Sequence, residues 1–332
     1  MVSSFQVKSH DLPGLRRALL SWYDENRRDL PWRKTRDPYR IWISEIMLQQ
    51  TRVAAVIVRY EQFLRRFPSV EKLAAARVSS VLAEWSGLGY YRRARNLHMA
   101  AKVIARCGEF PQNAESWRAL PGIGRYTAAA IASIGFDEPV AVVDGNVERV
   151  LRRWLGSLLS KSESWALAQE LLDQQRPGDF NQAVMELGAT VCIPVQPRCA
   201  DCPLQKVCRT RGHGESGRSK PRQQRREIIH VLVRRADSIL LVRRSPTQSL
   251  MPGMWELPRA SMPGSSDELL FSVRHSITVT DYRVHVVSRK KAVSQGKWVG
   301  LARLNGCALT GLTKKILRKV GIIQEMGIIE PT

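Results

Sequence analysis

The sequence has no long hydrophobic run. No apolar stretch approaches the roughly 20 residues that a membrane-spanning helix needs. The N-terminal residues MVSSFQVKSHD lack the apolar core of a signal peptide. The chain therefore carries no sign of a membrane partner or of secretion. We expect an intracellular protein in a reducing compartment, where disulfides are rare.

Acidic residues are also scarce. The 332 residues include 30 Asp and Glu against 52 Lys and Arg, which gives a formal net charge of +22. A field of this sign attracts polyanions, of which nucleic acid is the most common soluble one. A ribosomal protein or a protein of the membrane surface would show the same excess. The charge favours binding to phosphates but indicates no base sequence, because phosphate contacts carry none.

Cysteine is rare except in one segment. Four of the six cysteines follow the pattern C-x6-C-x2-C-x5-C: Cys192, Cys199, Cys202 and Cys208. This spacing is too dense for a globular core and too uneven for two matched zinc-binding pairs. Crowded thiolates select soft metals, and Cys202-Pro203 is similar to the Cys-Pro of ferredoxin cluster motifs. We predict a [4Fe–4S] cluster. Structural zinc and two disulfides are the alternatives, and disulfides fit a reducing compartment poorly.

Charge and hydrophobicity divide the chain into two domains joined by a linker. Residues 1–210 show a helical pattern, because apolar residues recur every three or four positions, with Pro and Gly mainly between such segments. Residues 211–227 contain many cations and no large apolar side chain, which is typical of a solvated linker. Residues 228–332 remain for a second, smaller domain, and the chain is long enough for two cores.

The second domain shows the patterns of short strands. Residues 228–233 and 238–242 are rich in β-branched side chains and predict a hairpin. Further strands are expected at 277–280 and 282–287, and a closing helix at 313–320. These elements predict an α+β domain that follows a mainly α-helical one.

The segment LPGIGRYT, residues 120–127, lies between two helical patterns. Gly122 and Gly124 flank an apolar residue and predict a tight hairpin between the two helices. The second helix opens with free N–H groups that suit a phosphate oxygen. Most G-x-G turns only connect helices. The net charge and the downstream cysteine segment are what support a phosphate-binding role for this one.

Two acidic residues are candidates for chemistry. Asp144 precedes Gly145 and Asn146, where an aspartate usually serves as a helix N-cap. Glu45 sits in an otherwise apolar helical segment, and its spacing is equally that of a solvated helix face. Periodicity alone does not decide between these interpretations.

Six motifs occur together and in order. They are PWR (31–33), WISEIMLQQT (42–51), GLGYYRRARNLH (87–98), LPGIGRYTAAAI (120–131), VDGNVERVL (143–151) and the four-cysteine segment. With this set, the chain resembles adenine DNA glycosylases of the MutY type, in the helix-hairpin-helix base-excision superfamily. The resemblance covers essentially residues 10–210.

The resemblance implies a two-lobed, mainly α-helical glycosylase domain. A six-helix lobe would span 31–134 and contain the helix-hairpin-helix motif at 113–134. The other lobe, built from 1–30 and 135–210, would hold the [4Fe–4S] cluster. A base flipped out of duplex DNA would enter the cleft between the lobes, because a stacked base is out of reach. The implied partner is duplex DNA with adenine opposite 8-oxoguanine or guanine, bound by a monomer in the cytoplasm or nucleoid.

The resemblance also implies roles for single residues. Glu45 would protonate the adenine, as a buried glutamic acid with a raised pKa can. Asp144 would meet the cationic sugar, in the two-carboxylate manner of retaining glycosidases. Asn146 and Tyr126 would hold both by hydrogen bonds. In the family's pattern, the adenine pocket would be lined by Trp32, Arg33 and Glu186. Gln50 and Tyr90 would form the wedge that enters the DNA.

Tyr126 bears on the reaction type. Endonuclease III relatives carry at this hairpin position a lysine, which attacks the sugar as an amine. A phenol cannot form that Schiff base, so we predict a monofunctional glycosylase.

The segment 240–260 resembles the start of a Nudix domain, but the glutamate-rich metal-binding helix of a Nudix hydrolase does not follow. In MutY relatives this domain recognises 8-oxoguanine, partly through a Phe-Ser-His turn. Here Ile277-Thr278-Val279 stands in its place. Thr278 keeps a hydroxyl for the lesion, or is an ordinary strand residue. A thymine or uracil mismatch glycosylase, or a non-catalytic iron–sulfur DNA-binding protein, are the alternative functions.

Overall fold

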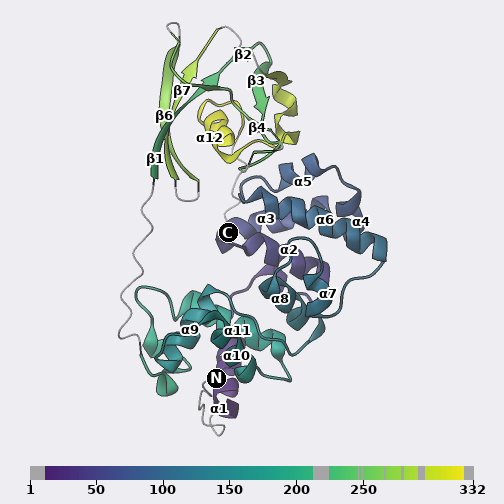
Figure 1. Cartoon of the computed structure of the whole chain (residues 1–332), viewed down its shortest axis with the longest axis vertical. Coiled ribbons are helices and arrows are strands. Elements are labelled where there is room, and N and C mark those ends of the chain that lie inside the picture. The colour runs from purple at the N-terminus through teal and green to yellow at the C-terminus, as the bar shows by residue number, and fades with distance from the viewer. Residues whose placement is uncertain are drawn as a thin grey trace. The chain divides into compact units, whose positions relative to one another are not determined.

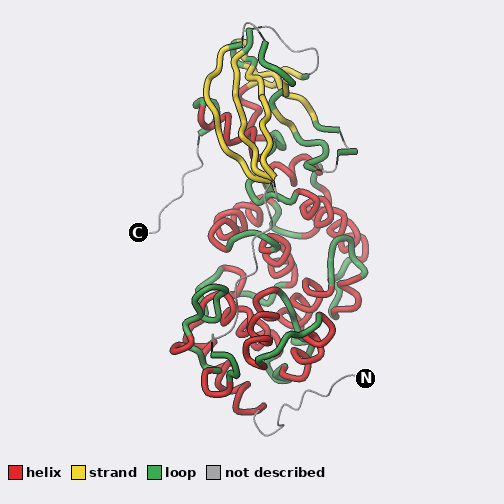
Figure 2. Tube along the Cα trace, turned by 60° about the vertical axis from the view of Figure 1, so that its left-hand side comes forward, coloured by secondary structure: helices red, strands yellow, loops and turns green. Residues whose placement is uncertain are grey.

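The computed structural model describes residues 12–211, 224–245, 247–248, 250–264, 267–277, 280–290 and 296–324. The chain divides into two compact units. The first unit contains residues 1–74 and 99–218, and the second contains residues 75–98 and 219–332. All described strands lie after residue 223, and Figure 2 shows them grouped together in one part of the chain.

The first unit is helical (Figure 1). Its elements are α1 (Leu12–Asn26), η2 (Pro31–Arg33), α2 (Pro38–Leu48), α3 (Val53–Arg66), α4 (Val70–Ala75), the last part of α6 (Tyr91–Cys107), α7 (Ala114–Arg118), α8 (Arg125–Phe136), α9 (Gly145–Leu155), α10 (Lys161–Leu171), α11 (Pro177–Thr190), η3 (Cys199–Asp201) and η4 (Gln205–Val207). The predicted mainly helical character of this region is confirmed.

Local signals in the sequence explain where several helices begin. Asp37 accepts a hydrogen bond from the backbone of Tyr39, and proline occupies the first position of α2. Ser160 and Glu163 form a capping box at the start of α10. A core of apolar side chains, which includes Leu19, Val150 and Leu187, joins α1, α9 and α11.

The predicted helical hairpin lies between α7 and α8. Asn113 caps α7 by accepting from the backbone of Ser116. Gly122 has a φ of 77°, a left-handed conformation that glycine adopts without steric cost. Gly124 is the N-cap residue of α8 and offers no side-chain acceptor. The first backbone N–H groups of α8 are therefore left for another partner.

The second unit contains a short helical segment and the β-structure (Figure 1). The helical segment is α5 (Val78–Glu84) with the start of α6. The β-structure has β1 (Gln224–Leu232), β2 (Arg234–Arg235), β3 (Ser238–Arg243), β4 (Trp255–Glu256), β5 (Arg259–Ala260), β6 (Glu268–Ile277), β7 (Thr280–Ser288) and β8 (Lys297–Gly300). It closes with η5 (Leu301–Gly306) and α12 (Gly311–Lys319).

The strands form two sheets. One has the order β5-β1-β7-β6, with β1 and β7 parallel and the other neighbours antiparallel. In the other, β3 pairs with β2, β4 and β8. Leu312, Ile316 and Leu317 of α12 pack against Val284 and Val286 of β7. Strands and a packed helix confirm an α/β region after the helical domain.

The expected hairpin is confirmed only in part. Across a turn at Ala236 and Asp237, Arg234 and Arg235 pair with β3, and the backbone N–H of Leu240 donates to the carbonyl oxygen of Val233. The preceding strand β1 pairs instead with β5 and β7. The expected strand at 277–280 is wrong at its two described residues, because Ile277 ends β6 and Thr280 begins β7. Residues 278 and 279 lie outside the described residues. Local patterns locate strands, but their partners depend on contacts with distant apolar runs. The predicted closing helix agrees with α12 to within two residues.

Among the described residues, no helix is both long and apolar enough to cross a membrane.

Close packing of α11 on α8 gives a test of the fold. A Cβ on Gly178 would lie 2.5 Å from the carbonyl oxygen of Ser133 and 2.8 Å from Cα of Ile134. Both are backbone atoms, so Gly178→Ala must push the helices apart and should cost about 1–3 kcal/mol. Chemical denaturation would measure it. Gly14→Ala in α1, where a Cβ meets nothing within 4 Å, is the matched control and should stabilise by about 0.4–1 kcal/mol. Equal effects of the two substitutions would contradict this packing.

Candidate active site and cysteine pocket

Glu45 is a buried acid on α2. Only 6% of the residue is exposed, because every residue from Ile41 to Met47 is buried. Burial raises the pKa of Glu45 to about 7; the neighbouring Tyr126 phenol and Arg33 lower the pKa, and the charge of Asp144 raises it further. Its Oε2 atom has no hydrogen-bond partner among the described residues. Glu45 is thus a carboxyl group that can hold a proton near neutral pH.

Asp144 is both a helix cap and a neighbour of Glu45. Its Oδ1 accepts hydrogen bonds from the backbone N–H groups of Asn146 at 2.9 Å and Val147 at 2.8 Å. The expected role as an N-cap is therefore confirmed. Anions are stabilised at a helix N-terminus, so this position suits an ionised carboxylate. Asp144 and Glu45 are 99 positions apart in the chain. Because the charge of Asp144 raises the pKa of Glu45, the fold must bring the two acids close together.

Tyr126 lies beside both acids on α8. Burial raises the pKa of its phenol well above the usual value, and the charges of Glu45 and Asp144 add to this effect. The phenol therefore stays protonated. It donates a hydrogen bond to Sδ of Met185 on α11, at 3.4 Å.

Asn146 connects Asp144 to the region of the cysteines. Its Nδ2 donates to Oδ2 of Asp144 at 3.1 Å, and its Oδ1 accepts from Nη2 of Arg149 at 2.9 Å. Arg149 also donates to the carbonyl oxygens of Gly188, at 2.7 Å, and Cys192, at 2.8 Å. A Cβ on Gly188 would meet Cβ of Asn146 at 2.7 Å. The side chain of Asn146 is thus held in one place.

Glu186 on α11 forms a buried ion cluster. Arg28 donates to both carboxylate oxygens at 2.7 Å, and Arg33 donates to Oε2 at 2.8 Å. Burial alone would raise the pKa of Glu186, but the hydrogen bonds from Arg28 and Arg33 outweigh it and lower the pKa to about 2. Beside Arg33, the buried Trp32 packs edge-on against Tyr60. Of the three predicted pocket residues, Arg33 links the other sites: it donates to Glu186, and its charge lowers the pKa of Glu45.

Both predicted wedge residues have unusual backbones. Gln50 has a φ of 54° and Tyr90 a φ of 47°, and both side chains are exposed. Non-glycine residues in this region are strained, and such strain is concentrated at functional sites. Gln50 belongs to the first unit and Tyr90 to the second. Thr278, the predicted lesion contact, lies outside the described residues.

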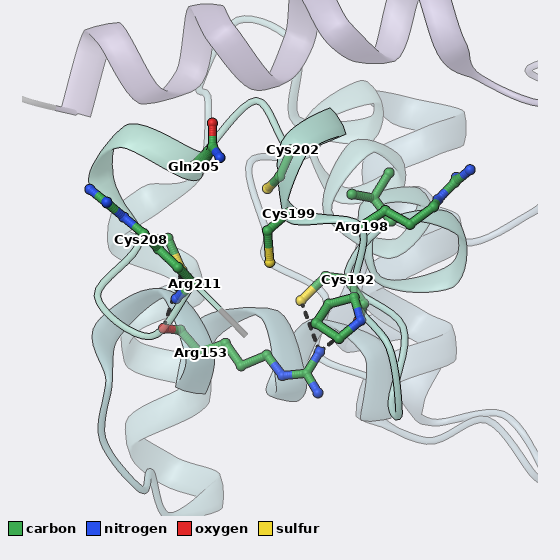
Figure 3. A pocket seen from close by; sticks show the side chains of 10 residues that line it. Arg153, Cys192, Arg198, Cys199, Cys202, Gln205, Cys208 and Arg211 are labelled. Atoms are coloured by element: carbon green, nitrogen blue, oxygen red, sulfur yellow. Dashed lines mark hydrogen bonds between the residues drawn. The ribbon is translucent and has the colours of Figure 1, made fainter. Parts of the chain in front are cut away.

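The four cysteines of the predicted cluster motif line one pocket of about 330 Å³, counted to its open mouth (Figure 3). Arg153, only 4% exposed, donates to Sγ of Cys192 at 3.5 Å and to the carbonyl oxygens of Ile193 and Pro194. The backbone N–H of Arg211 points to Sγ of Cys208 at 3.4 Å.

The side chains that line the pocket decide which group it would suit. Within the described chain, which includes all four cysteines, no three His, Cys, Asp or Glu side chains are grouped closely enough to hold a metal ion. The donor set around the pocket is nevertheless four thiols and a buried guanidinium, and it suits an anionic iron–sulfur cluster.

Sequence reasoning missed three residues of the site. Arg149 could have been found, because it lies three positions after Asn146 and so on the same helix face. Arg28 is one of two adjacent arginines, and nothing in the sequence distinguishes it from Arg27. Met185 precedes Glu186 and carries no signal of its own.

Comparison with known proteins agrees with this geometry. Residues 43–174 match the family described as HhH-GPD superfamily base excision DNA repair protein. The solved structure of a thermostable thymine-DNA glycosylase is 32% identical, with a TM-score of 0.57, over 60% of this chain and 96% of that one. An endonuclease III–DNA complex, 21% identical with a TM-score of 0.53, shares the fold. The chain belongs to the HhH-GPD superfamily of base excision DNA repair proteins.

Curated relatives carry the name adenine DNA glycosylase, and the predicted resemblance to that family is confirmed. The protein of Rattus norvegicus is 48% identical over 63% of this chain and 44% of its own length. The protein of Arabidopsis thaliana is 39% identical over 83% of this chain and 52% of its own length. The chain spans about half the length of the curated relatives it matches.

The buried acid predicts a pH-dependent penalty on stability. The folded pKa of Glu45 is about 7 and lies above the ordinary 4.5, so the folded state binds the extra proton. Stability is then fully present below pH 4.5 and is lost as the pH rises to about 7. Glu45→Gln removes the titration. Its stability relative to wild type should therefore rise by up to about 3 kcal/mol between pH 4.5 and 8.

Urea unfolding at both pH values would measure the difference. Glu25→Gln, at an exposed position on α1, controls for the loss of any carboxylate. A constant difference between Glu45→Gln and wild type across this range would contradict the assigned environment of Glu45.

Proposed function

We propose that this protein is a DNA glycosylase that hydrolyses the bond between adenine and deoxyribose in mispaired duplex DNA. The observation that carries the proposal is the convergence of Glu45 with Asp144, because a pKa of about 7 leaves about half of the Glu45 side chains protonated at neutral pH. A purine base leaves poorly as an anion, so cleavage needs an acid that reaches the base. The names of the curated relatives support adenine as that base.

The two carboxyl groups would act in different states. Glu45 would donate its proton to a ring nitrogen of the flipped adenine, and the carbon–nitrogen bond would break as the base leaves neutral. The sugar then carries positive charge. Asp144, fixed by the backbone of α9, would oppose that charge or bond transiently to the sugar. Glu45, now a carboxylate, would activate the water that completes hydrolysis.

The neighbouring residues would bind the base and the duplex. Arg33, Glu186 and the buried Trp32 would form the adenine pocket, with Arg28 holding the carboxylate of Glu186. The free N–H groups at the start of α8 would bind a phosphate. Gln50 and Tyr90, exposed on strained backbone, would enter the duplex where the base has left. The net charge of +22 supports duplex binding, and we propose that a monomer acts in the cytoplasm or nucleoid.

Tyr126 supports hydrolysis without strand cleavage. A lyase of this superfamily needs an amine that attacks the sugar, and Tyr126 offers a phenol that burial keeps protonated. We therefore propose a monofunctional glycosylase.

The cysteine pocket would hold a [4Fe–4S] cluster through Cys192, Cys199, Cys202 and Cys208. The group would supply a rigid anchor for the loop rather than a reaction step. Around it, Arg153 fixes the loop by its bonds to Ile193 and Pro194. The backbone N–H groups of Arg209 and Thr210 bond to the carbonyls of Trp154 and Arg153 at the other end of the loop.

The C-terminal sheets would form a Nudix-like domain that reads the base opposite adenine. The turn between β6 and β7 is the candidate contact for 8-oxoguanine, with Thr278 in the position of the family's Phe-Ser-His turn. Preference for 8-oxoguanine over guanine is part of this proposal. A thymine mismatch glycosylase is the competing function, favoured by the likeness to the thermostable thymine-DNA glycosylase.

Single-turnover base release would distinguish these functions. Duplexes with adenine opposite 8-oxoguanine, adenine opposite guanine and thymine opposite guanine would be compared. We expect adenine release, fastest opposite 8-oxoguanine, with strand breaks appearing only after alkali treatment. Glu45→Gln should reduce the rate by at least 100-fold, the range of general acid catalysis, about 10²–10⁴. Release of thymine alone would support the competing function, and an unchanged rate for Glu45→Gln would remove Glu45 from the mechanism.

Cofactor content gives an independent prediction. The purified protein should contain about four irons and four sulfides per chain, with a broad visible absorbance. Cys199→Ser should lower iron content and stability. Cys107→Ser, at an exposed cysteine away from the pocket, should change neither. One zinc per chain in place of iron would overturn the cluster.

A further inference from the structure

The phenol of Tyr126 has two acceptors within reach. It donates to Sδ of Met185 at 3.4 Å, and it is near enough to Glu45 to lower the pKa of that carboxyl group. A phenol carries one proton and can donate to only one acceptor at a time. A hydrogen bond to Met185 is therefore a hydrogen bond that Glu45 does not receive.

Met185 is well placed to hold that hydrogen bond. It lies on α11, directly before Glu186, and packs against two groups of buried side chains. One group contains Ala129 and Ala130 of α8, the helix that carries Tyr126. Sδ is thus fixed beside the phenol from a separate helix, while Oε2 of Glu45 has no partner among the described residues.

We propose that Met185 is a positioning residue which holds the Tyr126 hydroxyl away from Glu45 and so keeps Glu45 protonated in the free enzyme. A thioether is a weak acceptor, whereas a carboxylate is a strong one. Without the sulfur, the phenol turns to Glu45 and stabilises its ionised form. The inference rests on the proposed function, because a proton on Glu45 serves a purpose only in an acid-catalysed reaction.

Three other groups face Glu45 from the surrounding elements. Asp144 at the start of α9 favours the protonated form; Arg33 of η2 and Tyr126 of α8 favour the ionised form. Met185 carries no charge, so its replacement leaves Asp144 and Arg33 as they are. Glu186, the neighbour of Met185 in the chain, is held by Arg28 and Arg33.

The test is Met185→Leu, which removes the sulfur and nearly preserves the volume. Single-turnover adenine release would be measured from pH 5 to 9. Since Glu45 acts as an acid, the rate falls above the pKa of Glu45. In Met185→Leu this fall should move to lower pH by about one unit, so rates above it drop about tenfold. Rates well below the fall should match wild type.

Tyr126→Phe provides the control for mechanism. It removes a hydroxyl that Met185 already holds away from Glu45, so the fall in rate should stay close to its wild-type position. With Phe at 126, Met185→Leu should cause no further shift, because no hydroxyl remains to redirect. A wild-type pH profile for Met185→Leu, or a shift that persists with Phe at 126, would overturn the proposal.

A second measurement needs no substrate. In the full-length protein with ¹³C-labelled glutamate side chains, the Glu45 carboxyl signal is assigned by its loss in Glu45→Gln. Its titration midpoint should fall by about one pH unit in Met185→Leu. This result would support the Met185 contact even if adenine were not the substrate. An unchanged midpoint would refute the contact whatever base is released.

Discussion

The exclusion of water from Glu45 is the constraint on which the rest of the site depends. A carboxylate is costly to bury, so the buried carboxyl group of Glu45 on α2 holds its proton to a higher pH than an exposed glutamate. The charge of Asp144 strengthens that effect, and the Tyr126 phenol opposes it. The fold thereby creates a proton donor near neutral pH from a side chain that is ordinarily ionised. It does so at the cost of stability, as expected where function opposes folding.

The second carboxyl group shows how environment separates two like side chains. Asp144 is only partly buried, and backbone N–H groups of α9 donate to it. The start of a helix favours an anion, whereas the buried environment of Glu45 on α2 favours a neutral acid. Two carboxyl groups of similar intrinsic acidity therefore lie in different environments, which is the general pattern of acid and counter-charge in enzymes. The structural role of Asp144 as a cap and its proposed chemical role rely on the same two N–H groups.

Helix α11 assembles parts from distant regions of the chain. Its small residues allow close approach: Gly178 lies against the backbone of α8, and Gly188 lies against Asn146. The same helix presents Met185 to Tyr126 and Glu186 to the arginines. It ends just before Cys192, whose carbonyl accepts from Arg149. The ion cluster around Glu186, the neighbours of the two acids and the cysteine segment are thus linked through α11.

The sequence alone determined the helical first domain, the cap at Asp144, the hairpin glycines and the grouping of the cysteines, because each depends on neighbours within a few residues. It located β1, β3 and β7 but neither the other strands nor most of the pairing, and it left Glu45 between a solvated face and a buried acid. Only the tertiary structure decided these questions and revealed Arg28 and Met185, which meet partners 158 and 59 residues away. Burial and long-range contacts arise from how helices pack together, and a local pattern of residues does not contain that information.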